Sequence, residues 1–246
     1  MLCPPGTFSN KTGNPAREDC EPCTAGLSCS DHGLVQPNGV CTAGFFCPAG
    51  TAVPWLRCLF GFHCPSGSSE PQLCPAGSYQ DEVGRADCKG CPAGAYCSPD
   101  DTCLKENYTE PRACPPGHYC LANTSWPTQF PCPNGTFSNW TGLRAEAQCL
   151  ACLAGMYCDR PGLAQPTGPC SGGYYCTRAS NTASPVDGVM GGMCPMAHYC
   201  PVGTAQPVRC PAGTYSVGLG LQNASQCEPC PAGFYCGSQG PGLCLP

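Results

Sequence analysis

The chain of 246 residues contains no isoleucine, and only nine valines, sixteen leucines and eight phenylalanines, 33 residues in total. This is about 13% of the sequence, well below the level that a chain with an ordinary hydrophobic core reaches. Glycine and proline together number 62, about a quarter of the residues. Such a composition by itself predicts disorder, because too little apolar surface is buried to offset the conformational entropy of the chain.

Positive charge and long apolar runs are also scarce. The chain has 11 Lys and Arg against 16 Asp and Glu, a formal net charge of −5. A protein that binds nucleic acid needs a basic face, so we expect no nucleic-acid partner. No apolar run approaches the roughly 18 residues of a membrane-spanning helix, so we expect no membrane span in this chain.

We expect to find no signal peptide within this sequence, because Cys3 and Pro4 already belong to the first repeat. Its last residues, Cys244 to Pro246, stop inside a repeat. We therefore expect a piece of a longer secreted or membrane-anchored protein, with the signal and any anchor in a missing region.

Cysteine is abundant where core residues are few. The 28 cysteines are about 11% of the chain, the level of a secreted disulfide scaffold. In the chain-entropy model, a disulfide that closes a loop of about 15 residues stabilises the fold by roughly 3 kcal/mol. Disulfides can therefore replace the missing core. They also predict an extracellular location, secreted or on the cell surface, because the cytosol keeps thiols reduced.

Potential N-glycosylation sites support the same compartment. The sequence contains six Asn-x-Ser/Thr sequons, a number that favours a glycosylated ectodomain. Their asparagines are Asn10, Asn107, Asn123, Asn134, Asn139 and Asn223.

Two cysteine patterns repeat along the chain. The first, here called the long block, reads C-P-x-G-[TS]-[FY], then a polar stretch, then C-x-x-C. It begins at Cys3, Cys74, Cys132 and Cys210. The second, here called the short unit, reads C-x-x-G-x-[FY]-C with few departures. Its nine copies run over 23–29, 41–47, 58–64, 91–97, 114–120, 152–158, 170–176, 194–200 and 230–236.

These patterns predict the fold class. Glycine in the middle of the short unit permits a tight turn, and proline after the opening cysteine limits strand pairing. We expect a small disulfide-rich fold, mostly irregular with short β-hairpins and little or no helix. Each unit should contact mainly its neighbours in sequence, giving an elongated tandem-repeat array.

The long blocks divide the array into four repeat blocks. The first and third match at a constant offset of 129 residues, from Cys3 and Cys132 to Cys47 and Cys176, which indicates duplication. The predicted blocks are 3–73, a shorter 74–131 that is irregular at Cys103, 132–209, and a truncated 210–246.

The combined pattern resembles the ephrin-receptor-like cysteine-rich repeat, which is related to EGF-like and growth-factor-receptor cysteine-rich modules. Residues 210–236, CPAGTYSVGLGLQNASQCEPCPAGFYC, fit it best, and 132–158 and 3–29 follow. The resemblance implies an extracellular, disulfide-linked array with a structural or binding role.

Such modules also imply a disulfide pairing, which counting cysteines does not provide. The ends of the long blocks should pair as Cys3–Cys20, Cys74–Cys88, Cys132–Cys149 and Cys210–Cys227. The short units should be interlaced, as in Cys23–Cys41 with Cys29–Cys47, and Cys152–Cys170 with Cys158–Cys176. Cys103 and Cys244 should pair irregularly or remain free.

Catalytic and metal chemistry lack a recognisable motif. The C-x-x-C pairs could suggest zinc ribbons, but they lie far apart with other cysteines between them, as expected for half-cystines of different disulfides. No catalytic motif of the serine hydrolase, metalloprotease or P-loop kind occurs. We expect no catalytic residues, no metal site, no cofactor and no enzymatic activity.

Two functions fit these features. The first is a non-enzymatic extracellular structural or adhesion array that contacts other extracellular proteins. The second is the ligand-binding ectodomain of a cell-surface receptor. Trp55, Trp126 and Trp140 fit either function, as exposed binding residues or as cover for disulfides.

Overall fold

The computed structural model describes residues 2–13, 16–98 and 110–236. The chain divides into two compact units. The first comprises Met1–Ala113 with Leu121–Trp126, and the second comprises Cys114–Cys120 with Pro127–Pro246.

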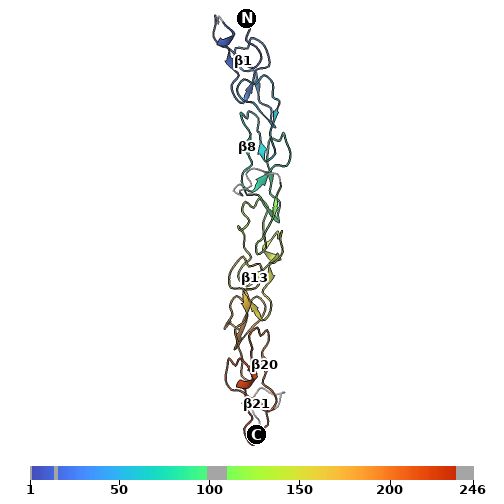
Figure 1. Cartoon of the computed structure of the whole chain (residues 1–246), viewed down its shortest axis with the longest axis vertical. Helices are drawn as coiled ribbons and strands as arrows, with labels where there is room; N and C mark the ends of the chain where they lie inside the picture. Colours follow the sequence, from blue (N-terminus) through green and yellow to red (C-terminus); the bar gives the residue numbers. More distant parts are fainter. Residues whose placement is uncertain (1, 14–15, 99–109, 237–246) are drawn as a thin grey trace. The chain divides into compact units, whose positions relative to one another are not determined.

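Short antiparallel hairpins account for almost all regular structure, as the paired arrows of Figure 1 show. The strands of the first unit are β1 (Thr7–Phe8), β2 (Glu21–Pro22), β3 (Leu27–Ser28), β4 (Gly39–Val40), β5 (Phe45–Phe46), β6 (Leu56–Arg57), β7 (Phe62–His63), β8 (Gln72–Leu73), β9 (Ser78–Tyr79), β10 (Lys89–Gly90), β11 (Ala95–Tyr96) and β12 (Arg112–Ala113). Those of the second are β13 (Thr136–Phe137), β14 (Leu150–Ala151), β15 (Met156–Tyr157), β16 (Gly168–Pro169), β17 (Tyr174–Cys176), β18 (Gly191–Met193), β19 (His198–Tyr199), β20 (Val208–Arg209), β21 (Thr214–Tyr215) and β22 (Glu228–Pro229).

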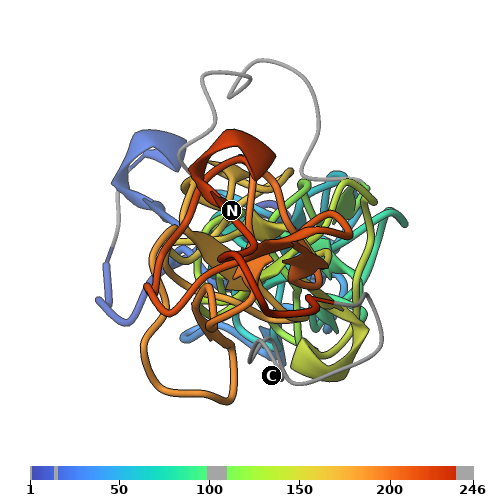
Figure 2. The same cartoon turned by 90° about the horizontal axis from the view of Figure 1, so that it is seen from below.

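The only helices in the described residues are three 3₁₀ turns of three residues each, drawn as coiled ribbons in Figure 2. They are η1 (Arg17–Asp19), η2 (Glu146–Gln148) and η3 (Ala224–Gln226). The predicted fold class, disulfide-rich with short hairpins and almost no helix, is confirmed.

In every hairpin, the strand that follows the fourth residue of a short unit or long block pairs with the strand just before the next opening cysteine. That fourth residue is a glycine except at Ala197. For example, β5 pairs with β6, Phe45 opposite Arg57 and Phe46 opposite Leu56, and Cys58 follows at once. The second strand of each hairpin ends just before the next opening cysteine, and each pairing spans only two or three residues.

The short units close on themselves, which corrects the interlaced pairing expected from the resemblance. The structure joins Cys23 to Cys29, Cys41 to Cys47, Cys152 to Cys158 and Cys170 to Cys176, in place of Cys23–Cys41, Cys29–Cys47, Cys152–Cys170 and Cys158–Cys176. The glycine turn reverses the chain and leaves the two Cα atoms of each unit 5.8–5.9 Å apart, within disulfide range. The remaining short units pair in the same way, as Cys58–Cys64, Cys91–Cys97, Cys114–Cys120, Cys194–Cys200 and Cys230–Cys236.

The long blocks are closed by their own disulfides. These join Cys3 to Cys20, Cys74 to Cys88, Cys132 to Cys149 and Cys210 to Cys227, the pairs that the resemblance implied. Cys103 and Cys244 lie outside the described residues.

Sulfur takes the place of a hydrocarbon core. Both half-cystines of the short units 23–29, 41–47 and 58–64 are 0% exposed. In the second unit, Phe137 and Leu163 pack against Cys152 and Cys158 in a small hydrophobic cluster. The scarcity of large apolar residues is therefore compatible with a fully buried interior.

Backbone hydrogen bonds join each short unit to the next along the chain. Gly44 donates its N–H to the carbonyl of Cys64 at 2.8 Å and accepts the N–H of Cys58 at 2.9 Å. Cys47 donates to the carbonyl of Ser68 at 2.9 Å. Gly84, inside the long block that begins at Cys74, donates its N–H to the carbonyl of Cys58 at 2.8 Å. This set of bonds, here called the backbone lattice, recurs in both compact units of the chain.

The lattice brings two backbones into direct contact at the turn glycine. A Cβ on Gly44, which has φ +86°, would lie 2.3 Å from the carbonyl oxygen of Gly84. No side chain fits that gap, and the left-handed backbone itself favours glycine. The same approach occurs at Gly6 with Gly50, Gly26 with Gly67, Gly77 with Asn123, Gly117 with Gly162, Gly135 with Ala179, Gly155 with Gly203, and Gly173 with Gly220.

Two nearby glycines allow a matched test of this contact. Gly44→Ala and Gly50→Ala share the left-handed penalty of roughly 1–2 kcal/mol, since Gly50 has φ +84°, but a Cβ on Gly50 meets nothing within 4 Å. We expect Gly44→Ala to speed hydrogen exchange at the Cys58 and Gly84 amides by about tenfold more than Gly50→Ala does. Equal exchange in the two variants, measured by NMR, would contradict the steric role of this contact.

Candidate functional site

Each long block begins as a short unit whose closing cysteine is replaced. The seventh residue of the four blocks is Ser9, Gln80, Ser138 or Ser216. All four are buried, and Gln80 and Ser138 are only 1% exposed. Since the seventh residue is no cysteine, the opening cysteine of each long block pairs with a cysteine 14 or 17 residues later.

These polar residues take over the lattice bonds of the missing cysteine. The carbonyl of Ser138 accepts the N–H of Gly117 at 2.8 Å, and its own N–H donates to Leu163 at 3.0 Å. Its hydroxyl oxygen accepts the N–H of Trp140 at 3.2 Å. The lattice therefore passes through Ser138, and the residues after it form a longer loop before Cys149.

The residues between the seventh residue and the next cysteine are here called the long loops: 10–19, 81–87, 139–148 and 217–226. Three of these loops rejoin the lattice, where Gly84, Gly142 and Gly220 donate their N–H groups to the carbonyls of Cys58, Cys114 and Cys194 at 2.8 Å. The loops 10–19, 139–148 and 217–226 end in a 3₁₀ turn held by a side chain. In the loop 139–148, the Gln148 side-chain oxygen accepts the N–H groups of Arg144 at 2.5 Å and Ala145 at 3.3 Å. Asp19 and Gln226 act in the same way in their loops.

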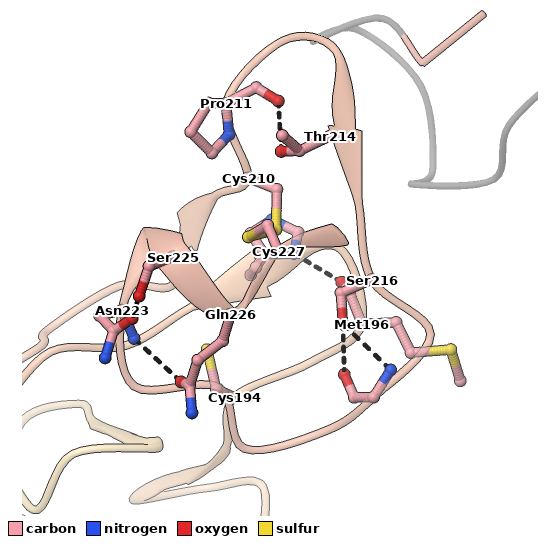
Figure 3. Close-up of a disulfide and its surroundings, with 12 residues drawn as sticks. Cys194, Met196, Cys210, Pro211, Thr214, Ser216, Asn223, Ser225, Gln226 and Cys227 are labelled. Atoms are coloured by element: carbon pink, nitrogen blue, oxygen red, sulfur yellow. Dashed lines mark hydrogen bonds between the residues drawn. A yellow bond between two sulfur atoms is a disulfide. The ribbon is translucent and has the colours of Figure 1, made fainter. Parts of the chain in front are cut away.

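Figure 3 shows this arrangement in the loop 217–226. The Cys210–Cys227 disulfide lies between Ser216 on one side and Asn223 with Ser225 on the other. The Ser225 hydroxyl donates to the side-chain oxygen of Asn223, and the N–H of Asn223 donates to Gln226 at 3.2 Å.

The loop 81–87 differs, because ion pairs replace the 3₁₀ turn. Lys89 donates to Asp81 at 2.5 Å and to Glu82 at 2.7 Å, and Arg85 donates to Glu82 through Nε at 2.7 Å. These side chains are between 38% and 55% exposed, so solvent screens the pairs and they add little stability.

The ion pairs shift the proton affinities of their members. The hydrogen bonds from Lys89 and then Arg85 hold the pKa of Glu82 below its ordinary value of 4.5. The hydrogen bonds to Asp81 and then Glu82 hold the pKa of Lys89 above its ordinary value of 10.5. Both groups are therefore charged throughout the physiological range.

A shallow hollow of about 480 Å³ lies beside this loop. It is lined by Ala43, Gln80, Gly84, Arg85, Ala86, Asp87, Cys88 and Lys89.

The described sequons lie on the surface. Asn10, Asn139 and Asn223 belong to long loops, whereas Asn123 and Asn134 belong to turns of the lattice, and all five asparagines are exposed. Asn107 lies outside the described residues. The three long loops with 3₁₀ turns each contain a sequon, and the charged loop contains none.

Exposed apolar side chains gather in one short segment. Val53, Trp55, Leu59 and Phe60 are between 51% and 70% exposed, within eight consecutive residues. Trp140, at 70%, and Trp126, at 42%, are also exposed. The three tryptophans thus leave much of their surface in contact with water.

The described residues contain no group of three His, Cys, Asp or Glu side chains that could hold a metal ion. In the same residues, no helix is long and apolar enough to cross a membrane.

Two features of the site escaped the sequence analysis. The seventh-residue substitution would be visible if C-P-x-G-[TS]-[FY]-[SQ] were aligned with C-x-x-G-x-[FY]-C. The ion pairs of Lys89 with Asp81 and Glu82 bridge seven or eight residues, and only the hairpin of β9 and β10 brings them together.

The pairing and the lattice define a disulfide-linked cysteine-rich repeat protein. Residues 61–102 match the family model described as tyrosine-protein kinase ephrin type A/B receptor-like. This match confirms the resemblance and covers the charged long loop. The search of curated proteins finds no match to the chain.

The Glu82 ion pairs predict a pH effect with a definite sign. A carboxylate with a lowered pKa stabilises its surroundings above the unfolded pKa of 4.5, and the effect is lost as pH falls through the lower folded pKa. In Lys89→Met, we expect the Glu82 midpoint, followed by carboxyl NMR shifts, to rise toward 4.5.

Lys11→Met is the matched control. Lys11 lies in the long loop 10–19 and pairs with Glu21 of β2 at 3.1 Å, far along the chain from Glu82. The substitution should leave the Glu82 midpoint unchanged. An unchanged midpoint in Lys89→Met would show that Lys89 does not hold the Glu82 carboxylate.

Proposed function

We propose that the chain is a non-enzymatic extracellular array that mediates protein–protein contacts, as part of a larger secreted or membrane protein. The observation that carries this proposal is the pairing of every described cysteine within the chain. Disulfides at this density persist only in an oxidising compartment. The family match at 61–102 supports a receptor-like module of the cell exterior.

The lattice serves in this proposal as a spacer, and the long loops as its contact surface. Backbone bonds fix each unit, so the loops are held on a rigid support. Glycans on Asn10, Asn139 and Asn223 would cover three of the four loops. The loop 81–87, with its charges and its hollow, remains open to a protein partner.

The four-block division also belongs to this proposal. Each of the four repeat blocks begins with one long block and so supplies one long loop. The repeat blocks are 3–73, 74–131, 132–209 and 210–246. A repeated protein with one loop per block offers several contacts to a partner, which raises avidity without strengthening any single contact.

Thiol counting tests the compartment and the pairing together. We expect the full chain, secreted from mammalian cells behind a borrowed signal peptide, to expose at most two alkylatable thiols, since 28 cysteines less 26 paired ones leaves two. Intact mass before and after N-glycan removal should show several glycans shed.

Cleavage of the unreduced, denatured chain before Asp31 separates the two pairing patterns. Self-closed units leave Cys23–Cys29 and Cys41–Cys47 in different peptides, whereas interlaced disulfides would hold the peptides together. Many free thiols, or bound zinc with no glycan, would overturn the extracellular proposal.

The alternative function is the ligand-binding ectodomain of a cell-surface receptor. The exposed apolar segment of Val53, Trp55, Leu59 and Phe60 favours it, because exposed aromatic residues are common centres of binding energy.

Trp55→Ala provides the test of this alternative. If the segment binds a ligand, Trp55→Ala should weaken saturable binding of the multimerised chain to a panel of cell lines by about tenfold or more. Trp140→Ala is the matched control, since both tryptophans are 70% exposed. Equal binding by both variants and the unaltered chain would reject the segment as a ligand site.

A further inference from the structure

Four of the described sequons, those of Asn10, Asn123, Asn134 and Asn139, fall into two structural classes, although all four asparagines are exposed. The difference lies in the second and third residues of each sequon. In one class these residues belong to the backbone lattice, and in the other they belong to a long loop.

The sequon of Asn134 is part of the lattice. Its middle residue, Gly135, is buried with φ +79°, and a Cβ there would lie 2.5 Å from the carbonyl oxygen of Ala179. Gly135 donates its N–H to Cys158 at 2.9 Å and accepts that of Cys152 at 2.8 Å. The hydroxyl of the third residue, Thr136, donates to the Pro133 carbonyl at 2.6 Å.

The sequon of Asn123 is held in a similar way. Its middle residue, Thr124, is 1% exposed, and its carbonyl accepts the N–H of Cys97 at 3.0 Å. Asn123 itself has φ +63° and donates its N–H to Cys91 at 2.8 Å. Its carbonyl oxygen would lie 2.5 Å from a Cβ on Gly77.

The sequons of Asn139 and Asn10 are open. Trp140, the middle residue of the first, is 70% exposed, and its N–H bonds only to the Ser138 hydroxyl two residues earlier. Lys11 makes the equivalent bond to Ser9 at 3.3 Å. The third residues, Thr141 and Thr12, are exposed, and their hydroxyls make no hydrogen bond with the rest of the described chain.

We propose that folding selects which sequons are glycosylated: Asn123 and Asn134 accept a glycan only before their turns close, whereas Asn10 and Asn139 accept one before or after. The proposal rests on the extracellular function proposed above. An enzyme that recognises a sequon must engage the asparagine amide and the Ser/Thr hydroxyl together. At Asn134 it can do so only when the Gly135 and Thr136 bonds have opened.

The same hydrogen bonds tie each closed sequon to a disulfide. Gly135 bonds to both half-cystines of Cys152–Cys158, and Asn123 with Thr124 bonds to both of Cys91–Cys97. Reduction of the disulfides should therefore open both sequons, and occupancy at these two sites records whether a glycan arrived before the pairing.

The matched pair Asn134 and Asn139 gives the sharpest experiment, because both lie in one long block. The probe is the full chain, made without glycans and with its disulfides in a bacterial periplasm, then incubated with an oligosaccharyltransferase and lipid-linked oligosaccharide. Asn139→Gln is used to follow Asn134 and Asn134→Gln to follow Asn139, so that neighbouring glycans do not block each other. Peptide mass spectrometry measures the rate at each site.

In the oxidised chain, we expect Asn134 to be modified at least about tenfold more slowly than Asn139, as for a site that must open locally. After reduction and alkylation the two rates should agree within about twofold. Asn123 should follow Asn134, and Asn10 should follow Asn139. Gly135→Ala, which cannot fit against Ala179, should raise the rate at Asn134 in the oxidised chain and leave Asn139 unchanged.

Equal rates in the oxidised chain would overturn the proposal and leave the glycosylated ectodomain intact. A slow Asn134 in the reduced chain would also overturn it, because local sequence would then set the rate. Failure of every sequon in the reduced chain would overturn both this proposal and the glycan shield of the proposed function.

Discussion

The rest of the structure depends on one constraint, the close contact between a turn glycine and a backbone carbonyl about 40 residues further along the chain, as between Gly44 and Gly84. At Gly44 and Gly84 the two backbones meet with no room for a side chain. Units can be this close only if small residues face each other and cysteines fill the interior. The glycines at the turn positions follow from this spacing, since a side chain there would force the two backbones apart.

The sequence predicted the fold class but neither the backbone lattice nor the pairing of the short-unit cysteines. Repeated spacing gave the units, the hairpins and the lack of helix, because proline and glycine act locally. The pairing of Cys23 with Cys29 depends on the chain reversal at Gly26, which spacing alone does not distinguish from an interlaced arrangement. Lys89 and Asp81 meet only through the hairpin register. The exposed sequons were visible in the sequence, whereas the burial of Thr124 needed three-dimensional contacts.

The fold separates support from surface within a single repeated sequence. Replacing the seventh cysteine by Ser9, Gln80, Ser138 or Ser216 keeps backbone bonds at this position and allows a longer loop before the next cysteine. Loop content can then vary, from a sequon to a set of ion pairs, without changing the support. The segment that matches the ephrin receptor-like model, 61–102, contains the one long loop with charges in place of a sequon.

Self-closed disulfides also determine how the chain responds to a pulling force. The span from Cys23 to Cys29 is fixed at a Cα separation of 5.9 Å, whatever force acts on it. Only the linkers between units, such as 30–40, can lengthen after their hydrogen bonds break. An interlaced pairing would have locked those linkers as well. The chain can therefore yield in small steps under tension while each disulfide-closed unit keeps its shape.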